Sequence, residues 1–203
     1  MDKIVAFHES AFGVTLDLVQ GVIDGFVGRE VRLSEMGDYF ADQEAVSEFL
    51  VDADPVIYRV TSVETGAGIG QLHAELGVIF PGKVGSEYHC TKGHFHNWRP
   101  AAEVYVGLRG SGFMLLEEES TEYTKMLPLA TQSFVYVPGY TAHRTINTGQ
   151  EPLVYLGVYP AEAGHDYGVI AERNFQYVLV EIKGQSVSME RCQYLNRIES
   201  LRS

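Results

Sequence analysis

From residue 56 to residue 182 the chain repeats one pattern, in which short runs of β-branched, aliphatic and aromatic residues are broken by turn signals. Such runs predict β-strands, and the segments rich in Pro and Gly between them predict tight turns. No stretch of helical periodicity separates the central runs, which disfavours a parallel sheet and favours a sandwich or a barrel. The predicted strands are residues 56–63, 74–80, 103–109, 113–118, 133–138, 144–147, 152–159 and 176–182.

The first fifty or so residues follow a different pattern. Residues 42–50 begin at Asp42, a residue type that caps helix N-termini, and predict a short amphipathic helix. Its apolar face consists of Ala45, Val46, Phe49 and Leu50. The last dozen residues predict a short helix or a frayed tail. We therefore expect an N-terminal segment (1–55) packed on a barrel (56–190), followed by a C-terminal tail (191–203).

Composition narrows the class of protein. A chain of 203 residues, 45% hydrophobic, fits one large domain with a sizeable core. A formal net charge of −12 argues against nucleic acid as a partner, because phosphate backbones demand a basic surface. Cys90 and Cys192 form no CxxC pair and are expected to be reduced thiols. Neither a secretion signal nor an apolar run of membrane-spanning length is present, so we expect a cytoplasmic protein without membrane contact.

The strongest chemical signal starts at His94 and His96. On a strand, residues two apart point to the same face with Cα atoms ~6.6 Å apart, so two imidazoles converge on one ion. Glu103 follows a loop-like stretch and begins the next apolar run, and His143 follows the turn Pro138-Gly139-Tyr140. Three imidazoles and one carboxylate suit a divalent transition metal such as iron, manganese, nickel or zinc. We expect one such ion per subunit.

A His-x-His pair by itself is more often a pair of surface or core histidines than a metal site. The spacing of Glu103 and the separate element that carries His143 are what favour metal binding here. The histidines at positions 8, 73 and 89 show no comparable convergence, and we expect structural or surface roles for them.

Two motifs resemble those of a known family. Residues 93–96 (GHFH), followed by Glu103 and Gly110, resemble the first signature of the cupin family. Residues 138–143, followed by Asn147, resemble the second. The resemblance implies an all-β fold, the cupin double-stranded β-helix barrel, which is jelly-roll-like, with a short N-terminal helical or extended segment.

Two departures from the common cupin pattern select one branch of the family. The gap between His96 and Glu103 is longer than in most cupins, and Tyr140 stands where many cupins have glycine. Both features match the archaeal-type, metal-dependent phosphoglucose isomerases. The segments similar to that branch, within about residues 50–185, are PGKVGSEY, TKGHFH, AEVYVGLRGSG, YVPGYTAHRTIN and YPAEAGHDYG.

The resemblance implies an aldose–ketose isomerase that interconverts glucose 6-phosphate and fructose 6-phosphate in glycolysis and gluconeogenesis. It implies a homodimer and a divalent metal, iron first, with nickel, manganese or zinc as alternatives. In that reaction Glu103 would carry a proton between C1 and C2 besides ligating the metal. By the same resemblance, His165 assists ring opening or orients a sugar hydroxyl, and Tyr167 lines the pocket. The alternatives are that Glu103 only ligates and that His165 is bonded in a surface turn.

Recognition of the phosphate needs local donors in so acidic a chain. Tyr105 shares the strand face of Glu103, where it either contacts the sugar or simply packs. Lys92 and Arg144 flank the ligands but alternate to the opposite face, so we expect surface charges there. Some relatives use a threonine for phosphate at a position that corresponds to Gly77 here. The substrate-binding residues that the resemblance implies are Tyr58, Thr91, Gly93 and Tyr159.

Two other functions fit the same ligand set. An iron-dependent cupin dioxygenase would need an apolar substrate pocket and an open oxygen site. A non-catalytic sugar-binding or regulatory cupin would keep the barrel without turnover, although no DNA-binding helix pair accompanies it.

Overall fold

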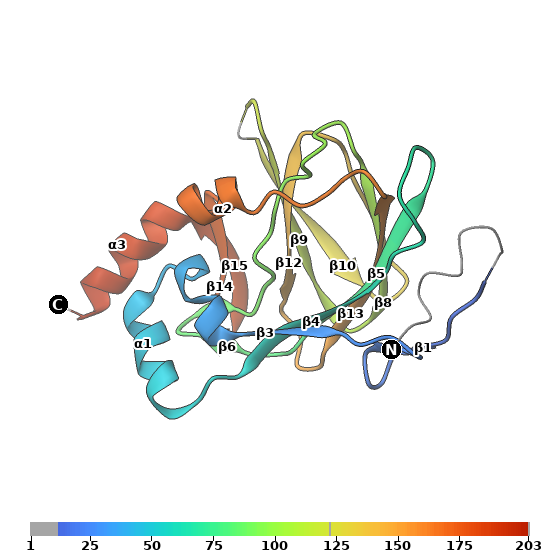
Figure 1. The fold of residues 1–203 in the computed structure, drawn as a ribbon. Helices are drawn as coiled ribbons and strands as arrows, with labels where there is room; N and C mark the ends of the chain where they lie inside the picture. The colour runs from blue at the N-terminus through green and yellow to red at the C-terminus, as the bar shows by residue number, and fades with distance from the viewer. Residues whose placement is uncertain (1–11, 122, 203) are drawn as a thin grey trace.

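The computed structural model describes residues 12–121 and 123–202 (Figure 1). Four groups of strands and three α-helices make up this part of the chain. The strands are β1 (Leu16–Asp17), β2 (Val22–Ile23), β3 (Arg29–Arg32), β4 (Val56–Val63), β5 (Leu72–Ile79), β6 (Lys83–Val84), β7 (Glu87–Tyr88), β8 (Glu103–Arg109), β9 (Ser111–Glu118), β10 (Thr124–Ala130), β11 (Phe134–Val137), β12 (Thr141–Asn147), β13 (Leu153–Pro160), β14 (Tyr177–Ile182) and β15 (Gln185–Glu190). The helices are α1 (Gln43–Asp52), α2 (Gly168–Arg173) and α3 (Arg191–Arg202), with 3-10 turns at Leu33–Glu35 and Gly37–Tyr39.

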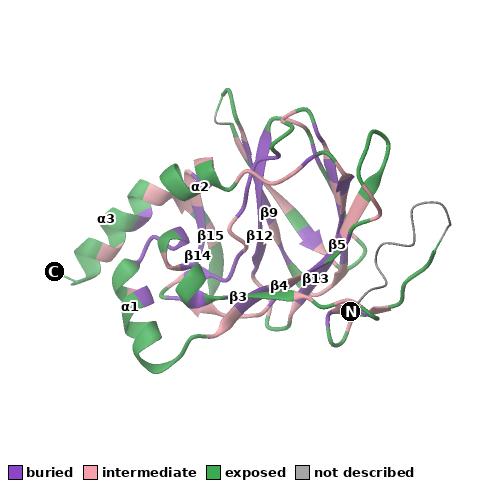
Figure 2. Cartoon of the chain, viewed as in Figure 1, coloured by how far each residue is buried: buried purple, intermediate pink, exposed green. Residues whose placement is uncertain are grey.

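Two antiparallel sheets enclose the core. One has six strands in the order β11-β8-β13-β5-β4-β3, and the other has three in the order β10-β9-β12. The large apolar cluster draws side chains from both, including Leu115 and Ile146 from the smaller sheet and Ile57 and Tyr155 from the larger one. Every residue of β12 is buried, and Figure 2 shows this strand running through the middle of the fold. The metal-binding motif on β12 therefore lies inside the molecule.

The all-β prediction is confirmed, and the arrangement is compatible with the expected jelly roll. Among the described strands the two sheets that enclose the core do not close into one continuous barrel. A third sheet, β15-β14-β7-β6, lies with α1 and α3 at one end of the molecule (Figure 1). The boundary expected at residue 55 stays a prediction. β3 lies before it and pairs with β4 after it.

The predicted helix at residues 42–50 is present as α1, and the Asp42 side chain accepts a hydrogen bond from the Ala45 amide at 3.0 Å. Only Val46 of its apolar face is buried, while Phe49 and Leu50 remain exposed. The C-terminal residues form helix α3 rather than a frayed tail. Both cysteines are free thiols, and within the described ranges no helix has the length and apolar character needed to span a membrane.

Strand β10 was not predicted from the sequence. Pro128 interrupts its pattern and cannot donate to a neighbouring strand. β10 is an edge strand that pairs with β9 alone, so the missing donor faces no partner.

Candidate metal centre and substrate pocket

Four buried side chains converge inside the fold: His94, His96, Glu103 and His143. Each offers one ligand atom, and these atoms all lie within 4.8 Å of one another. The segment with His94 runs antiparallel to β12, and the His94 and His143 backbones exchange N–H···O bonds of 3.2 and 3.1 Å. Glu103 begins β8 in the opposite sheet. Two sheets thus meet at one point, as the spacing of the motifs predicted.

The histidine rings are oriented for coordination. The Nδ1 atoms of His96 and His143 lie 3.1 and 3.2 Å from the carbonyls of Ala101 and Thr141, so each donates there and leaves Nε2 as an acceptor. Among the residues that the structure describes, His94 Nε2 and Glu103 Oε1 are buried without a hydrogen-bond partner. Buried polar atoms rarely stay unsatisfied, so this donor set fits a divalent transition metal.

The electrostatics keep the ligands in their metal-binding states. Burial, reinforced by the neighbouring imidazoles, lowers the pKa of His94 well below its usual value. Burial would raise the pKa of Glu103, but the influence of the adjacent His143 and His96 outweighs it and lowers that pKa to about 2. Glu103 Oε2 lies 3.2 Å from His96 Nε2 and 3.1 Å from His143 Nε2. A neutral His94 and an ionised Glu103 are the forms that bind metal.

Unusual backbone conformations precede two of the ligands, His94 and His143. Gly93 has φ +73°, and a Cβ there would lie 2.6 Å from Phe175 and 2.9 Å from the His143 carbonyl. Tyr140 also has a positive φ, +60°, which is uncommon for a residue with a side chain. Its amide donates to the Arg99 carbonyl at 2.6 Å, and this bond anchors the turn that precedes His143.

Arg99 is a positioning residue that sequence reasoning missed. Its guanidinium donates to the carbonyl oxygen of the ligand His96 and forms ion pairs with Glu119 at 2.8 Å and Asp166 at 2.7 Å. Asp166 in turn exchanges two backbone hydrogen bonds with Phe95. Arg99 thereby ties the ligand loop to the segment that carries His165. From the sequence, Arg99 was interpreted only as part of a loop, because Pro100 follows it.

His165 and Tyr167 lie beside the metal cluster. The His165 ring centroid is 4.4 Å from that of His94, and it stacks on Tyr167 at 5.9 Å. Burial lowers the pKa of His165 and raises that of Tyr167 to about 12, so both are neutral at neutral pH. Tyr159 packs 5.4 Å from His165 and donates to Glu75 at 3.4 Å. It therefore lies toward the metal side.

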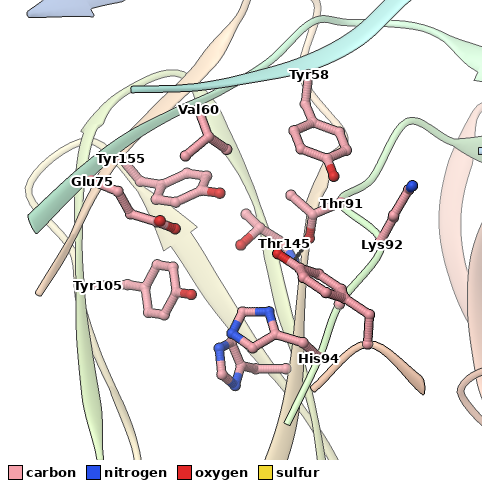
Figure 3. A pocket seen from close by; sticks show the side chains of 12 residues that line it. Tyr58, Val60, Glu75, Thr91, Lys92, His94, Tyr105, Thr145 and Tyr155 are labelled. Atoms are coloured by element: carbon pink, nitrogen blue, oxygen red, sulfur yellow. Dashed lines mark hydrogen bonds between the residues drawn. The ribbon is translucent and has the colours of Figure 1, made fainter. Parts of the chain in front are cut away.

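A pocket opens from the cluster between the two sheets (Figure 3). Four of the predicted substrate residues line it: Tyr58, Thr91, Gly93 and Tyr105. Tyr159 is not part of this lining. The lining residues that the sequence did not single out are Val60, Glu75, Thr145 and Tyr155. Val60, Glu75 and Tyr155 come from β4, β5 and β13, whose sequences carry no motif, so only the tertiary arrangement reveals them. Thr145 lies on β12 between His143 and Asn147, two residues from a predicted ligand.

Gly77 faces the ring of Tyr155 across the β5–β13 pair. A Cβ at Gly77 would lie 2.1 Å from Tyr155 Cζ and 2.4 Å from its hydroxyl oxygen. The Tyr155 side chain thus fills the place that a side chain at position 77 would need. The phenol of Tyr155 therefore occupies the space that the threonine hydroxyl of some relatives would take at position 77.

The expectation of surface charges at Lys92 and Arg144 is wrong. Arg144 is buried, donates to the Lys92 carbonyl at 2.7 Å and stacks 4.6 Å from the Phe175 ring. Lys92 lines the pocket, with its ammonium 5.5 Å from the Tyr39 ring centroid. Arg144 does point to the face of β12 opposite His143, but Tyr39 and Phe175 cover that face instead of water. Lys92 is two residues before His94, so in an extended segment it shares the face of His94.

The other histidines stand apart from the centre. His89 and His73 lie near backbone carbonyls, with His89 Nδ1 3.1 Å from Phe80 O and His73 Nε2 3.0 Å from Gly66 O. His8 lies outside the described residues.

Comparison with known proteins agrees with the resemblance seen in the motifs. The glucose-6-phosphate isomerase (GPI) family model matches residues 31–196. The chain is 46% identical to a glucose-6-phosphate isomerase of Pyrococcus horikoshii over 88% of this chain and 94% of that protein. It is 44% identical to the enzyme of the same name from Thermococcus litoralis, over 89% and 94%. An oxalate oxidase structure resembles 56% of each chain at 12% identity with a TM-score of 0.47, too low a score to add to the evidence for the fold. The chain belongs to the glucose-6-phosphate isomerase family.

Proposed function

We propose that this chain interconverts glucose 6-phosphate and fructose 6-phosphate with a divalent transition metal held by His94, His96, Glu103 and His143. The observation that carries the proposal is the buried set of four convergent ligands with unsatisfied donor atoms, beside a pocket rich in hydroxyls. When bound, the metal supplies Lewis-acid stabilisation of the negative charge that develops on O1 and O2 as a proton leaves carbon.

Glu103 carries the proton in this proposal. Its Oε2 faces His96 and His143, whereas its Oε1 has no hydrogen-bond partner within residues 12–121 and 123–202. Gly157 leaves room beside that oxygen, because a Cβ there would lie 2.7 Å from it. Oε1 takes a proton from C2 of the aldose and returns it to C1, as one general base and acid, while the proton of the O2 hydroxyl passes to O1.

The neighbouring residues bind and orient the substrate. The neutral His165 beside Tyr167 assists opening of the sugar ring. The hydroxyls of Tyr58 and Thr91 and the amide of Gly93 hold the phosphate, joined by Lys92, which also lines this pocket. Tyr105 is buried near Glu103 and packs against the end of the substrate that reacts. Tyr159 lies behind this part of the pocket and hydrogen-bonds Glu75.

Several finer assignments belong to the same proposal. We infer iron as the physiological metal, a role in glycolysis and gluconeogenesis, and a cytoplasmic location. A homodimer is supported by edge strand β11, which exposes Phe134 and Tyr136. Light scattering of the purified chain distinguishes a dimer from a monomer.

A coupled assay that converts fructose 6-phosphate to glucose 6-phosphate tests the activity. We expect turnover by the metal-loaded protein and no oxygen consumption with aromatic or thiol substrates. Oxygen uptake without isomerisation would instead identify a dioxygenase. Sugar phosphate binding with no turnover under any metal would identify a non-catalytic cupin.

A further inference from the structure

Glu75 is a buried carboxyl group in the pocket to which the mechanism above gives no direct task. It lies on the inward face of β5 and is 8% exposed. Figure 3 shows its carboxyl group directed into the pocket between Tyr105 and Tyr155. It is not one of the four clustered metal ligands.

The fold makes room for this carboxyl group. Gly157 on β13 pairs with Glu75 on one side and with Tyr105 on the other. A Cβ at Gly157 would lie 3.3 Å from Glu75 Cγ and 2.7 Å from Glu103 Oε1. The sheet is thus hollowed where Glu75 and Glu103 approach each other. Two pairs further along, on the same face, the sizes are reversed, with Tyr155 covering Gly77.

The protein itself does little to satisfy Glu75. Within the described residues, the Tyr159 hydroxyl donates a long hydrogen bond to Glu75 at 3.4 Å, and no Lys or Arg pairs with this carboxyl group. Burial and the nearby charge of Glu103 raise the pKa of Glu75 to about 8. A buried carboxyl group without a cation is costly, and it keeps spare capacity to accept and donate hydrogen bonds.

The position of Glu75 matches the middle of an open-chain sugar phosphate. The imidazole of His94 marks one end of the pocket, and the hydroxyls of Tyr58 and Thr91 mark the other (Figure 3). With the carbonyl carbons at the first end and the phosphate at the second, the middle carbons face the wall that carries Glu75. We propose that Glu75 is a specificity-determining residue that hydrogen-bonds the substrate hydroxyl at C3 or C4. This inference rests on the proposed function.

Deoxy substrates test the contact directly. We would measure kcat/KM for glucose 6-phosphate and for its 3-deoxy and 4-deoxy analogues, following the aldose-to-ketose conversion by NMR. The enzymes are the metal-loaded wild type, Glu75→Ala and Glu75→Gln. For the wild type, kcat/KM should be about tenfold lower with one of the two analogues than with glucose 6-phosphate. For Glu75→Ala, kcat/KM with glucose 6-phosphate should fall about tenfold, and the ratio of kcat/KM between glucose 6-phosphate and that analogue should drop below two. Glu75→Gln can still form a hydrogen bond and should keep most of the wild-type ratio.

A merely structural role predicts a different pattern. Glu87→Gln is the matched control, because Glu87 is a buried glutamate that binds the Ala41 amide at 2.6 Å outside the pocket lining. It should keep wild-type discrimination. If Glu75→Ala does not fold, Glu75→Met of similar shape takes its place. Unchanged discrimination in a folded, active Glu75 variant, or none in the wild type, would overturn this inference alone. No turnover of glucose 6-phosphate by the loaded wild type would remove the proposed function and this inference together.

Discussion

The two ends of the pocket are built on different physical principles. At the metal end, ionisable side chains are held by bonds to backbone carbonyls, such as those from His96 to Ala101 and from His143 to Thr141. At the other end, the lining includes the neutral hydroxyls of Tyr58, Thr91 and Thr145. Preorganised charge is most valuable where charge develops during the reaction. Where an anion is only held, neutral donors joined by one ammonium group, that of Lys92, are enough.

Removing the ionisable oxygen at the metal end should have the largest effect. Glu103→Gln keeps one oxygen for the metal but no longer acts as a base at Oε1. We expect kcat to fall about 10³-fold with little change in KM. The coupled assay, together with metal analysis of the variant, measures this. Wild-type turnover at full metal content would remove the base assignment and leave the role of the metal standing.

Loosening the support of the metal end should have the next largest effect. Arg99→Met breaks the bond to the His96 carbonyl and both ion pairs. Residues that orient ligands typically contribute 10–100-fold in metal affinity, and we expect about tenfold weaker binding here. A competition titration with a chelator measures it. Arg109→Met, which breaks the exposed pair with Glu151, is the matched control and should bind metal normally.

A change at the hydroxyl end should affect binding instead of chemistry. Thr91→Val removes a hydroxyl that lines the pocket and accepts the Thr145 amide at 3.1 Å. We expect KM for fructose 6-phosphate to rise about tenfold with kcat nearly unchanged. Thr61→Val is the control, because Thr61 is buried outside the pocket lining and its hydroxyl has no hydrogen-bond partner in the described part of the chain. A fall in kcat as large as that of Glu103→Gln would erase the distinction between the two ends.

A change far from both ends should affect stability alone. Asp42→Ala removes the side-chain cap of α1 and an ion pair with Arg202. We expect the free energy of unfolding in urea to fall by about 1 kcal/mol, with kcat and KM unchanged. Altered kinetic constants in this variant would mean that α1 communicates with the pocket.

The same contrast explains how far sequence reasoning reaches. The metal end could be predicted, because strand alternation places His94 and His96 together and the family motifs include Glu103 and His143. The wall of the pocket that carries Glu75 and Tyr155 could not be predicted. Glu75 and Tyr155 enter the pocket through their pairing with Gly157 and Gly77, which depends on the register between β5 and β13. Arg144 was misjudged because sequence alternation does not tell what covers a strand.

The central claim is that isomerisation requires a metal at the cluster of three histidines and one glutamate. The most direct measurement is the rate of fructose 6-phosphate conversion before chelation, after chelation, and after iron, nickel or manganese is added back. Metal analysis of each sample accompanies the assay. We predict that activity disappears with the metal and returns with any of the three ions. Full activity in protein shown to be free of metal would contradict the account.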